Sequence, residues 1–198
     1  MNQTIDVAAA DPTQHPYRWA MLFGVWLIYF AFGLTISALA PMVGPITHDL
    51  GLSHGAMGTV LGAWPFIYIG AAVPCGILLD RIGARRALLL AAMIMAASGL
   101  CRAMAVDHLS LFLAVGIFGF GGPLISIGAP KIIAEWFEGK ERGFAMGIYI
   151  TGPAIGGILS LSLTNAVVLP FHGGDWRMVV MDYAAITAAA GFIWLLIA

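Results

Sequence analysis

The sequence predicts an all-α membrane protein that crosses the bilayer six times. Of its 198 residues, 61% are hydrophobic and only 10% are charged, whereas soluble domains are about half apolar and a quarter charged. The apolar residues lie in six blocks, each long enough at about 1.5 Å per helical residue to cross a hydrocarbon core of ~30 Å. Short polar segments separate these blocks. A soluble fold would have too few charged residues to cover its surface.

The expected bundle occupies residues 19–198, after a polar tail over residues 1–18 that we expect to be disordered. A cleavable signal peptide is the competing interpretation of the first apolar block, because "SALA" before Pro41 resembles a cleavage site. The apolar run before it is too long and Arg18 is its only basic residue, which favours a retained span. The expected spans are about 19–41, 56–79, 87–106, 110–130, 144–170 and 178–198.

Lys and Arg residues predict the orientation, because short cytoplasmic loops carry an excess of them. Seven of the nine flank one side of the expected bundle and two, Arg102 and Arg177, lie on or near the other. This distribution predicts an inner-membrane protein whose N-terminus faces the cytoplasm. The segments "GILLDRIGARRA" and "KIIAEWFEGKERG" are then cytoplasmic loops, and the loop with His48 and His54 faces outward.

Cysteine and histidine placement gives no sign of a redox or metal centre. Cys75 and Cys101 fall near opposite membrane faces, separated by more than a disulfide can span. His48 and His54 have no third ligand in view, so we expect no metal and no other cofactor. There is also no nucleophile–base pair or phosphate-binding glycine loop, and we expect neither an enzyme nor a nucleic-acid-binding protein.

The first and fourth spans resemble one another, as do the second and fifth. "ISALAP" at 36–41 corresponds to "ISIGAP" at 125–130, and "AMG" at 56–58 recurs at 145–147 with the same offset, as does Gly33 with Gly122. A repeat of three spans must enter the membrane the other way up in its second copy. The sequence therefore predicts two inverted three-helix repeats, a common construction of secondary transporters.

The charged segment between spans two and three carries a spaced pattern of glycines, one aspartate and arginines. It resembles the loop signature of the major facilitator superfamily, Gly-x-Leu-x-Asp-Arg-x-Gly-Arg-Arg/Lys, with alanine at the first position of the usual basic pair. The resemblance implies a gate in which Asp80 contacts a second half of the transporter near a helix N-terminus. A purely topological role explains the arginines but not the aspartate and glycines. The implied gating residues are Gly76, Asp80, Arg81, Gly83, Arg85 and Arg86.

Two further segments resemble the same family. "TGPAIGG" is similar to its Gly-Pro-x-x-Gly-Gly element in helix five, often described in antiporters, although simple small-residue packing explains it equally well. "AEWFEGKERGFAMG" at 134–147 is similar to the loop before that helix. Span four lacks the arginine that many members use for proton coupling. The residues of the helix-five element are Gly152, Pro153, Gly156 and Gly157.

Only Arg102 and Asp182 place charges inside the expected spans, and intramembrane charges are functional candidates. Arg102 either attracts an anionic substrate, forms an ion pair with Asp182, or reaches the interface. Its position, with spans four and five, resembles cyanate and nitroimidazole permeases. In this family spans one, two, four and five line the path. The substrate candidates are Thr35, Ser37, Trp64, Tyr68, Arg102, Ser126, Tyr149 and Thr151.

The resemblance implies the N-terminal half of a secondary transporter for a small solute, with an anion favoured, working by alternating access. A complete member has about twelve spans, so we expect a piece of a longer protein whose partner is a missing C-terminal half. A half-size chain that pairs with a second copy, or a membrane scaffold without transport of its own, is the alternative. In each case the lipid bilayer is the surrounding medium.

Overall fold

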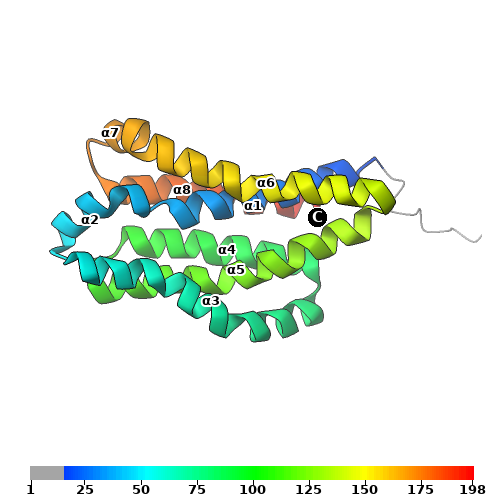
Figure 1. Ribbon diagram of the computed structural model, residues 1–198, viewed down its shortest axis with the longest axis horizontal. Helices are drawn as coiled ribbons and strands as arrows, with labels where there is room; N and C mark the ends of the chain where they lie inside the picture. The colour runs from blue at the N-terminus through cyan, green and yellow to red at the C-terminus, as the bar shows by residue number, and fades with distance from the viewer. Residues whose placement is uncertain (1–15) are drawn as a thin grey trace, which may run out of the picture.

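The computed structural model describes residues 16–198, and within them six helices are long and apolar enough to cross a membrane (Figure 1). The first span consists of α1 (Arg18–Ser37), the 3-10 turn η2 (Ala40–Met42) and α2 (Val43–Leu50). The next three are α3 (His54–Ile82), α4 (Ala84–Ala103) and α5 (His108–Trp136). The last two are α6 (Gly139–Leu163) with the π-helical η3 (Thr164–Val168) and α7 (Leu169–Phe171), and then α8 (Trp176–Ile197). The predicted all-α, six-helix class is confirmed.

Local chemistry sets several helix ends. Asp107 begins α5 with a capping box: its carboxylate accepts from the Ser110 amide at 2.8 Å, and the Ser110 hydroxyl accepts from the Asp107 amide at 3.0 Å. Gly83 alone separates α3 from α4, with φ at +82°, a conformation that side chains rarely adopt. The glycine of the charged segment therefore makes a one-residue turn between two spans.

Two expected loops are shorter than the sequence indicated, and both corrections have the same cause. His48 lies in α2, within the helical first span rather than in a loop. The loop "KIIAEWFEGKERG" reduces to Phe137 and Glu138, because α5 continues through Trp136 and α6 starts at Gly139. Hydropathy marks where apolar residues end, but a helix can extend beyond the membrane while its residues are good helix formers.

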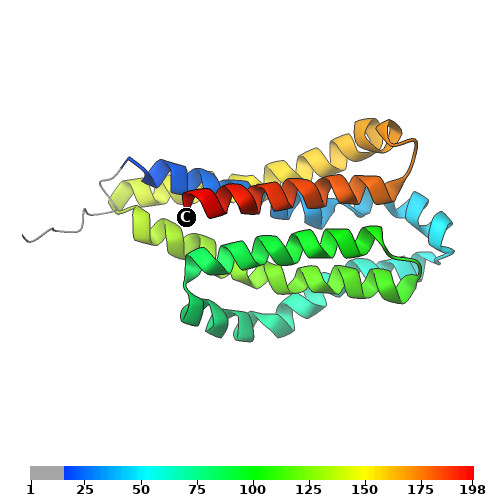
Figure 2. The ribbon, with the colours of Figure 1, turned by 180° about the vertical axis from the view of Figure 1, so that it is seen from behind.

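The helices form two groups of three, which Figure 1 shows one above the other. One group consists of α1, α6 and α8, and the other of α3, α4 and α5; contacts between α4 and α8 join them. Seen from behind, α8 and α4 run side by side along the near face (Figure 2). The side with α3 and α6 and the side with α4 and α8 are thus opposite faces of the bundle.

The contacts between helices follow the symmetry expected of inverted repeats. The first repeat consists of α1, α3 and α4, and the second consists of α5, α6 and α8 in the same order. If the two repeats are exchanged, α1 takes the place of α5, α3 that of α6, and α4 that of α8. The pairing of α1 with α6 then becomes that of α5 with α3, and α1 with α8 becomes α5 with α4; all four contacts are present. Gly33 and Gly122 lie at equivalent places, since Gly33 contacts Pro153 on α6 and Gly122 contacts Tyr68 on α3.

The spans differ widely in how much of their surface the bundle covers. In the fourth span 67% of the most apolar stretch is buried, against 22% in the second and 17% in the fifth. Large apolar side chains such as Phe66, Ile69 and Ile158 are accordingly exposed on α3 and α6. One face of the bundle therefore presents two mostly uncovered helices.

Candidate functional site

Aromatic rings from four helices form a continuous chain of contacts through the middle of the molecule. Tyr149 on α6 meets Tyr29 on α1 edge-on, with centroids 5.3 Å apart. Trp64 and Tyr68 on α3 meet at 6.2 Å. Phe32 of α1 and Phe118 of α5 connect the two pairs. We call this set the aromatic chain: Tyr149, Tyr29, Phe32, Phe118, Trp64 and Tyr68.

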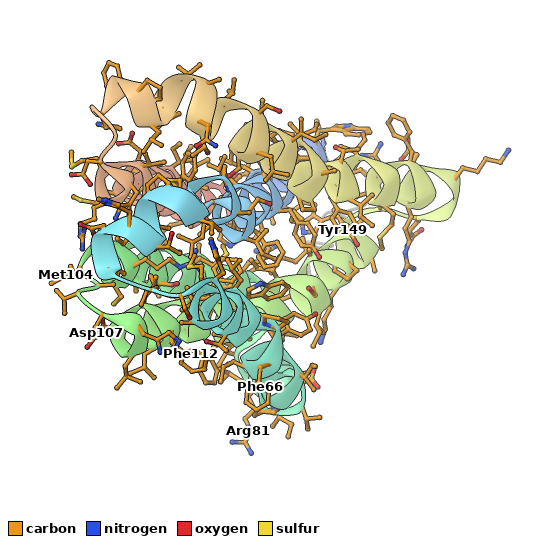
Figure 3. All side chains as sticks on the ribbon, turned by 60° about the vertical axis from the view of Figure 1, so that its left-hand side comes forward. Phe66, Arg81, Met104, Asp107, Phe112 and Tyr149 are labelled. Atoms are coloured by element: carbon orange, nitrogen blue, oxygen red, sulfur yellow. The ribbon has the colours of Figure 1, made fainter. Side chains whose placement is uncertain are left out.

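Glycines on α5 allow the rings of α3 to approach. A Cβ at Gly122 would lie 2.6 Å from the Tyr68 ring, and one at Gly119 would lie 2.7 Å from the Trp64 carbonyl oxygen. Any side chain at either position would therefore push α3 away from α5. Figure 3 shows Tyr149 in the space between the two helix groups. The aromatic chain thus spans the junction between the groups.

The predicted cavity residues fall into two sets. Trp64, Tyr68 and Tyr149 belong to the aromatic chain, and the side chain of Ser126 lies close to that of Tyr29. All of these but Tyr149 are partly exposed, and Tyr149 is 8% exposed. Hydroxyl groups at the surface of an aromatic wall can hydrogen-bond a polar solute while the rings exclude water.

The other predicted residues lie elsewhere. The Thr35 hydroxyl is buried against Thr187 of α8 at 3.0 Å, away from the aromatic chain. Thr151 is exposed on α6, where it accepts from the Trp26 indole at 2.9 Å. The hydroxyl of Ser37 lies in contact range of Gly157, at the packing of α1 on α6. These three residues join helices to one another in this structure.

Sequence reasoning missed three members of the aromatic chain, Tyr29, Phe32 and Phe118. Tyr29 and Phe32 are three residues apart, which places them on neighbouring positions of one helix face. That spacing was a usable signal. No sequence signal pointed to Phe118, because its place in the aromatic chain depends on contacts with Phe32 and Trp64 on other helices.

Arg102 is buried directly behind the aromatic chain. Only 2% of its surface is exposed, and its guanidinium carbon lies 5.1 Å from the centre of the Phe118 ring. One terminal nitrogen donates to the Thr35 carbonyl oxygen at 3.1 Å, near the end of α1. Within residues 16–198 the Nε of Arg102 has no hydrogen-bond partner. The site therefore contains a buried positive charge held by a carbonyl group and an aromatic face.

The ion pair expected between Arg102 and Asp182 does not form. Asp182 instead pairs with His172, whose Nε2 lies 2.6 Å from the carboxylate. Reaching the interface is also excluded for Arg102 by its burial. Both expectations relied on depth alone, whereas α4 turns Arg102 toward α1 and α5, and η3 with α7 brings His172 back over α8.

The charged segment, residues 76–87, lies at the end of the bundle where most Lys and Arg residues gather, which we call the basic end. Its residues make different kinds of contact. Asp80 forms an ion pair with Lys131 of α5 at 3.0 Å, in a largely exposed position. Arg85 donates to the Ala198 carbonyl at 3.1 Å and lies over the Trp136 ring at 5.4 Å. Arg81 and Arg86 are exposed and make no hydrogen bond or ion pair with any described residue. In this segment, Gly76 lies near Ile127 of α5.

The helix-five element packs α6 against α1. A Cβ at Gly156 would lie 2.2 Å from the Phe30 carbonyl oxygen, and one at Gly152 would lie 2.8 Å from that of Trp26. Pro153 in turn lies against Gly33. The backbones of the two helices therefore touch, as in other membrane interfaces rich in small residues.

The fold and these residues define a class of protein. Six apolar spans arranged as two inverted three-helix repeats are the construction found in several families of membrane transporter. Among residues 16–198 no three His, Cys, Asp or Glu residues group as metal ligands would. The sequence model of the Major Facilitator Superfamily matches residues 25–198, and the chain belongs to that superfamily.

Several curated relatives are similar to the chain. The nitrate/nitrite transporter NrtP of Nostoc punctiforme is 29% identical over 89% of this chain and 36% of the relative. A probable L-galactonate transporter of Escherichia coli is 34% identical over 67% of this chain and 28% of the relative. A galacturonate transporter of Dickeya chrysanthemi is 28% identical over 90% of this chain and 50% of the relative. The chain thus spans half or less of the length of these relatives.

A solved structure supports the fold. The crystal structure of a bacterial homologue of the human lysosomal transporter Spinster, inward-facing and unoccupied, superposes with a TM-score of 0.81. It is 20% identical in sequence, and the match covers 92% of this chain and 43% of that one. At this identity the likeness shows the fold alone.

Proposed function

We propose that the chain forms the N-terminal half of a secondary transporter for a small anionic solute that works by alternating access. The observation that carries the proposal is Arg102, a buried cation behind the Phe118 ring of the aromatic chain and without a carboxylate partner among the described residues. A charge inside a membrane protein is expensive to keep and is retained where it has a function. Its positive potential favours an anion in the adjoining site.

The names of the relatives agree with an anionic solute. Nitrate, nitrite, L-galactonate and galacturonate are small anions, and the transporters named for them are similar to this chain. A sugar acid also presents hydroxyl groups, for which the hydroxyls of Tyr29, Tyr68 and Ser126 offer partners. The narrower resemblance to cyanate and nitroimidazole permeases gives a further hypothesis for the solute.

The uncovered α3 and α6 supply the surface for a second half. We propose that a C-terminal half, or a second copy, packs on this face and closes the path over the aromatic chain. The basic end then faces the cytoplasm of the inner membrane, in agreement with the excess of Lys and Arg there. Asp80 lies at that end, where it can exchange Lys131 for a partner on the second half.

The test is uptake of labelled nitrate, cyanate, galactonate and galacturonate into proteoliposomes that contain the complete translated product. We expect at least one anion to enter faster than into empty vesicles, and Arg102→Met to abolish that uptake. Asp182→Asn is the matched control, because it removes the other intramembrane charge, which does not contact the aromatic chain. If folded protein takes up none of these anions, the scaffold alternative is favoured instead.

A further inference from the structure

A groove runs along the seam between α4 and α8, on the face opposite the uncovered α3 and α6. Figure 2 shows these two helices side by side. The main part of the groove has a volume of about 390 Å³ and almost no polar surface. Its floor consists of small residues, among them Ala92, Ala96, Ala188 and Gly191, and its walls are Met93, Leu100, Phe192 and Leu195.

Small residues account for the shape of the groove. A Cβ at Gly99 would lie 2.7 Å from that of Ala184, and one at Gly191 would lie 3.0 Å from that of Ala92. The two helices therefore pack closely along the seam, and the alanines between them leave a hollow. The wall residues on either side are about half exposed, as Met93 at 55% and Leu195 at 57% show.

Toward the basic end of the bundle a second hollow of about 340 Å³ lies next to the groove. Leu89 and Leu195 line both hollows, so the two adjoin one another. The second hollow is lined by Arg85 and Arg86, with Trp194 and Ala198 beside them. Arg85 already donates to the Ala198 carbonyl, but Arg86 makes no hydrogen bond or ion pair with any residue in 16–198.

The dimensions fit one leaflet of a bilayer. From Leu89 to Leu100 the groove follows α4 for about 16 Å by helix rise. Half of a hydrocarbon core of ~30 Å is ~15 Å. An acyl chain whose headgroup lies at the two arginines would therefore reach the bilayer midplane where the groove ends. Charge and depth together select an anionic lipid over a neutral one.

We propose that this groove, Leu89 to Leu100 on α4 with Ala188 to Leu195 on α8, is a binding site for one anionic phospholipid. The phosphate group lies between Arg85 and Arg86, and one acyl chain fills the alanine-floored part. The site depends on the membrane-spanning fold alone and not on the proposed transport activity. Failure of either proposal therefore leaves the other standing.

The experiment is native mass spectrometry of the purified protein in detergent, with phosphatidylglycerol or phosphatidylcholine of identical acyl chains. We expect one phosphatidylglycerol to be retained per chain in preference to phosphatidylcholine. Arg86→Gln should weaken retention of phosphatidylglycerol about fivefold, the effect of one basic residue near anionic lipid, and leave phosphatidylcholine unchanged. Lys140→Gln, which removes an exposed charge at the same end but outside the groove, should change neither.

A second pair of variants tests the acyl-chain part. Ala188→Phe fills the groove and should reduce retention of both lipids, whereas Ala189→Phe, on the exposed neighbouring position outside it, should reduce neither. Melting temperatures identify misfolded variants, and Ala97→Leu replaces Ala188→Phe if that variant does not fold. Soluble glycerol phosphate, which has the headgroup charge without the chains, should not compete.

Four results would overturn the proposal. The first is equal retention of the two lipids by the unsubstituted protein. The second is equal loss from Arg86→Gln and Lys140→Gln, which would indicate diffuse attraction to the basic end. The third is full competition by glycerol phosphate. The fourth is a dimer that Ala188→Phe abolishes, because a second copy would then occupy the groove.

Discussion

Arg102 combines two properties that rarely occur together, complete burial and the lack of a counter-ion among the described residues. Its contacts are the Thr35 carbonyl and the Phe118 ring, which stabilise a cation less than a carboxylate does. Desolvation of a charge can exceed what such contacts return. The residue is therefore a local cost to stability, which the bundle tolerates at the place where a solute anion would benefit from it.

Arg102→Met separates the structural role of this side chain from its electrostatic one. Methionine keeps most of the volume against Phe118 and removes the buried charge, so we expect a melting temperature equal to or above that of the unsubstituted protein. Arg102→Ala, which also leaves a cavity, should lower stability by roughly 2–5 kcal/mol. Thermal denaturation in detergent measures both. A large loss of stability in the methionine variant would contradict this account.

The same residue gives a test of its independence from Asp182. Because Asp182 pairs with His172 and not with Arg102, the effects of Arg102→Ala and Asp182→Ala should add within about 0.5 kcal/mol. A double variant no less stable than either single variant would show that the two side chains form one interaction. Unfolding free energies of the three variants decide between these outcomes.

At the scale of helices, α1 and α6 are held together by backbone contact at glycines. Gly156→Ala places a Cβ 2.2 Å from the Phe30 carbonyl oxygen, and we expect it to destabilise the bundle by roughly 1–3 kcal/mol. Gly147→Ala is the matched control on the same helix, because nothing lies within 4 Å of its Cβ. It should be neutral, or stabilising by up to ~1 kcal/mol through helix propensity. The melting temperature of Gly156→Ala should therefore be clearly lower than that of Gly147→Ala.

Asp107, the residue that begins α5, should make the stability of the protein depend on pH in the acidic range. Hydrogen bonds from the Ser110 hydroxyl and amide hold the pKa of the Asp107 carboxyl below its ordinary value. Its contribution is therefore present above the unfolded-state pKa of about 3.9 and is lost as pH falls through the lower folded pKa. Asp107→Ala should lower the melting temperature near pH 7, and the difference from the unsubstituted protein should shrink at the most acidic pH.

Asp107→Asn controls for charge, because asparagine is also a good N-cap but does not titrate in this range. We expect it to keep most of the melting temperature and to lose the acid dependence that belongs to this group. If Asp107→Ala and the unsubstituted protein differ equally at every pH, the carboxylate is not the source of the effect.

Sequence patterns predicted the spans and the repeat well because both rest on properties of single residues in order, namely hydropathy and spacing. From helix number alone they suggested Tyr68 and Tyr149 as substrate residues, which stays a prediction, although both belong to the aromatic chain. They did not predict where Thr35 or Asp182 would point, because that depends on how far each helix rotates toward Thr187 or His172. Nor did hydropathy show that α5 and α6 extend beyond the membrane to a two-residue connection.

Taken as a whole, the molecule has two opposite faces of different shape, one with the uncovered α3 and α6 and one with the groove between α4 and α8. On the first face, the Asp80–Lys131 pair lies at the basic end, where it is exposed. If Asp80 has the proposed gating role, Asp80→Asn should slow solute uptake by the complete transporter while binding of the solute stays unchanged, because Asp80 is not part of the aromatic chain. Glu135→Gln, which neutralises another exposed acid at the same end, should alter neither quantity. Uptake rates compared with solute affinity provide the measurement, and unchanged turnover in Asp80→Asn would contradict a gating role.

Because α1 packs on helices of the second repeat, its partners are synthesised much later than α1 itself. α1 packs on α6 and α8, which leave the ribosome only after some hundred further residues have been synthesised. At about 5–20 residues per second, α1 waits on the order of 10 s in the lipid before its partners arrive. During that interval the carbonyls and glycines that later meet α6 face acyl chains. The buried Arg102 of α4 is synthesised within the same interval and can bind the Thr35 carbonyl first, so this contact offers α1 an early anchor during biogenesis.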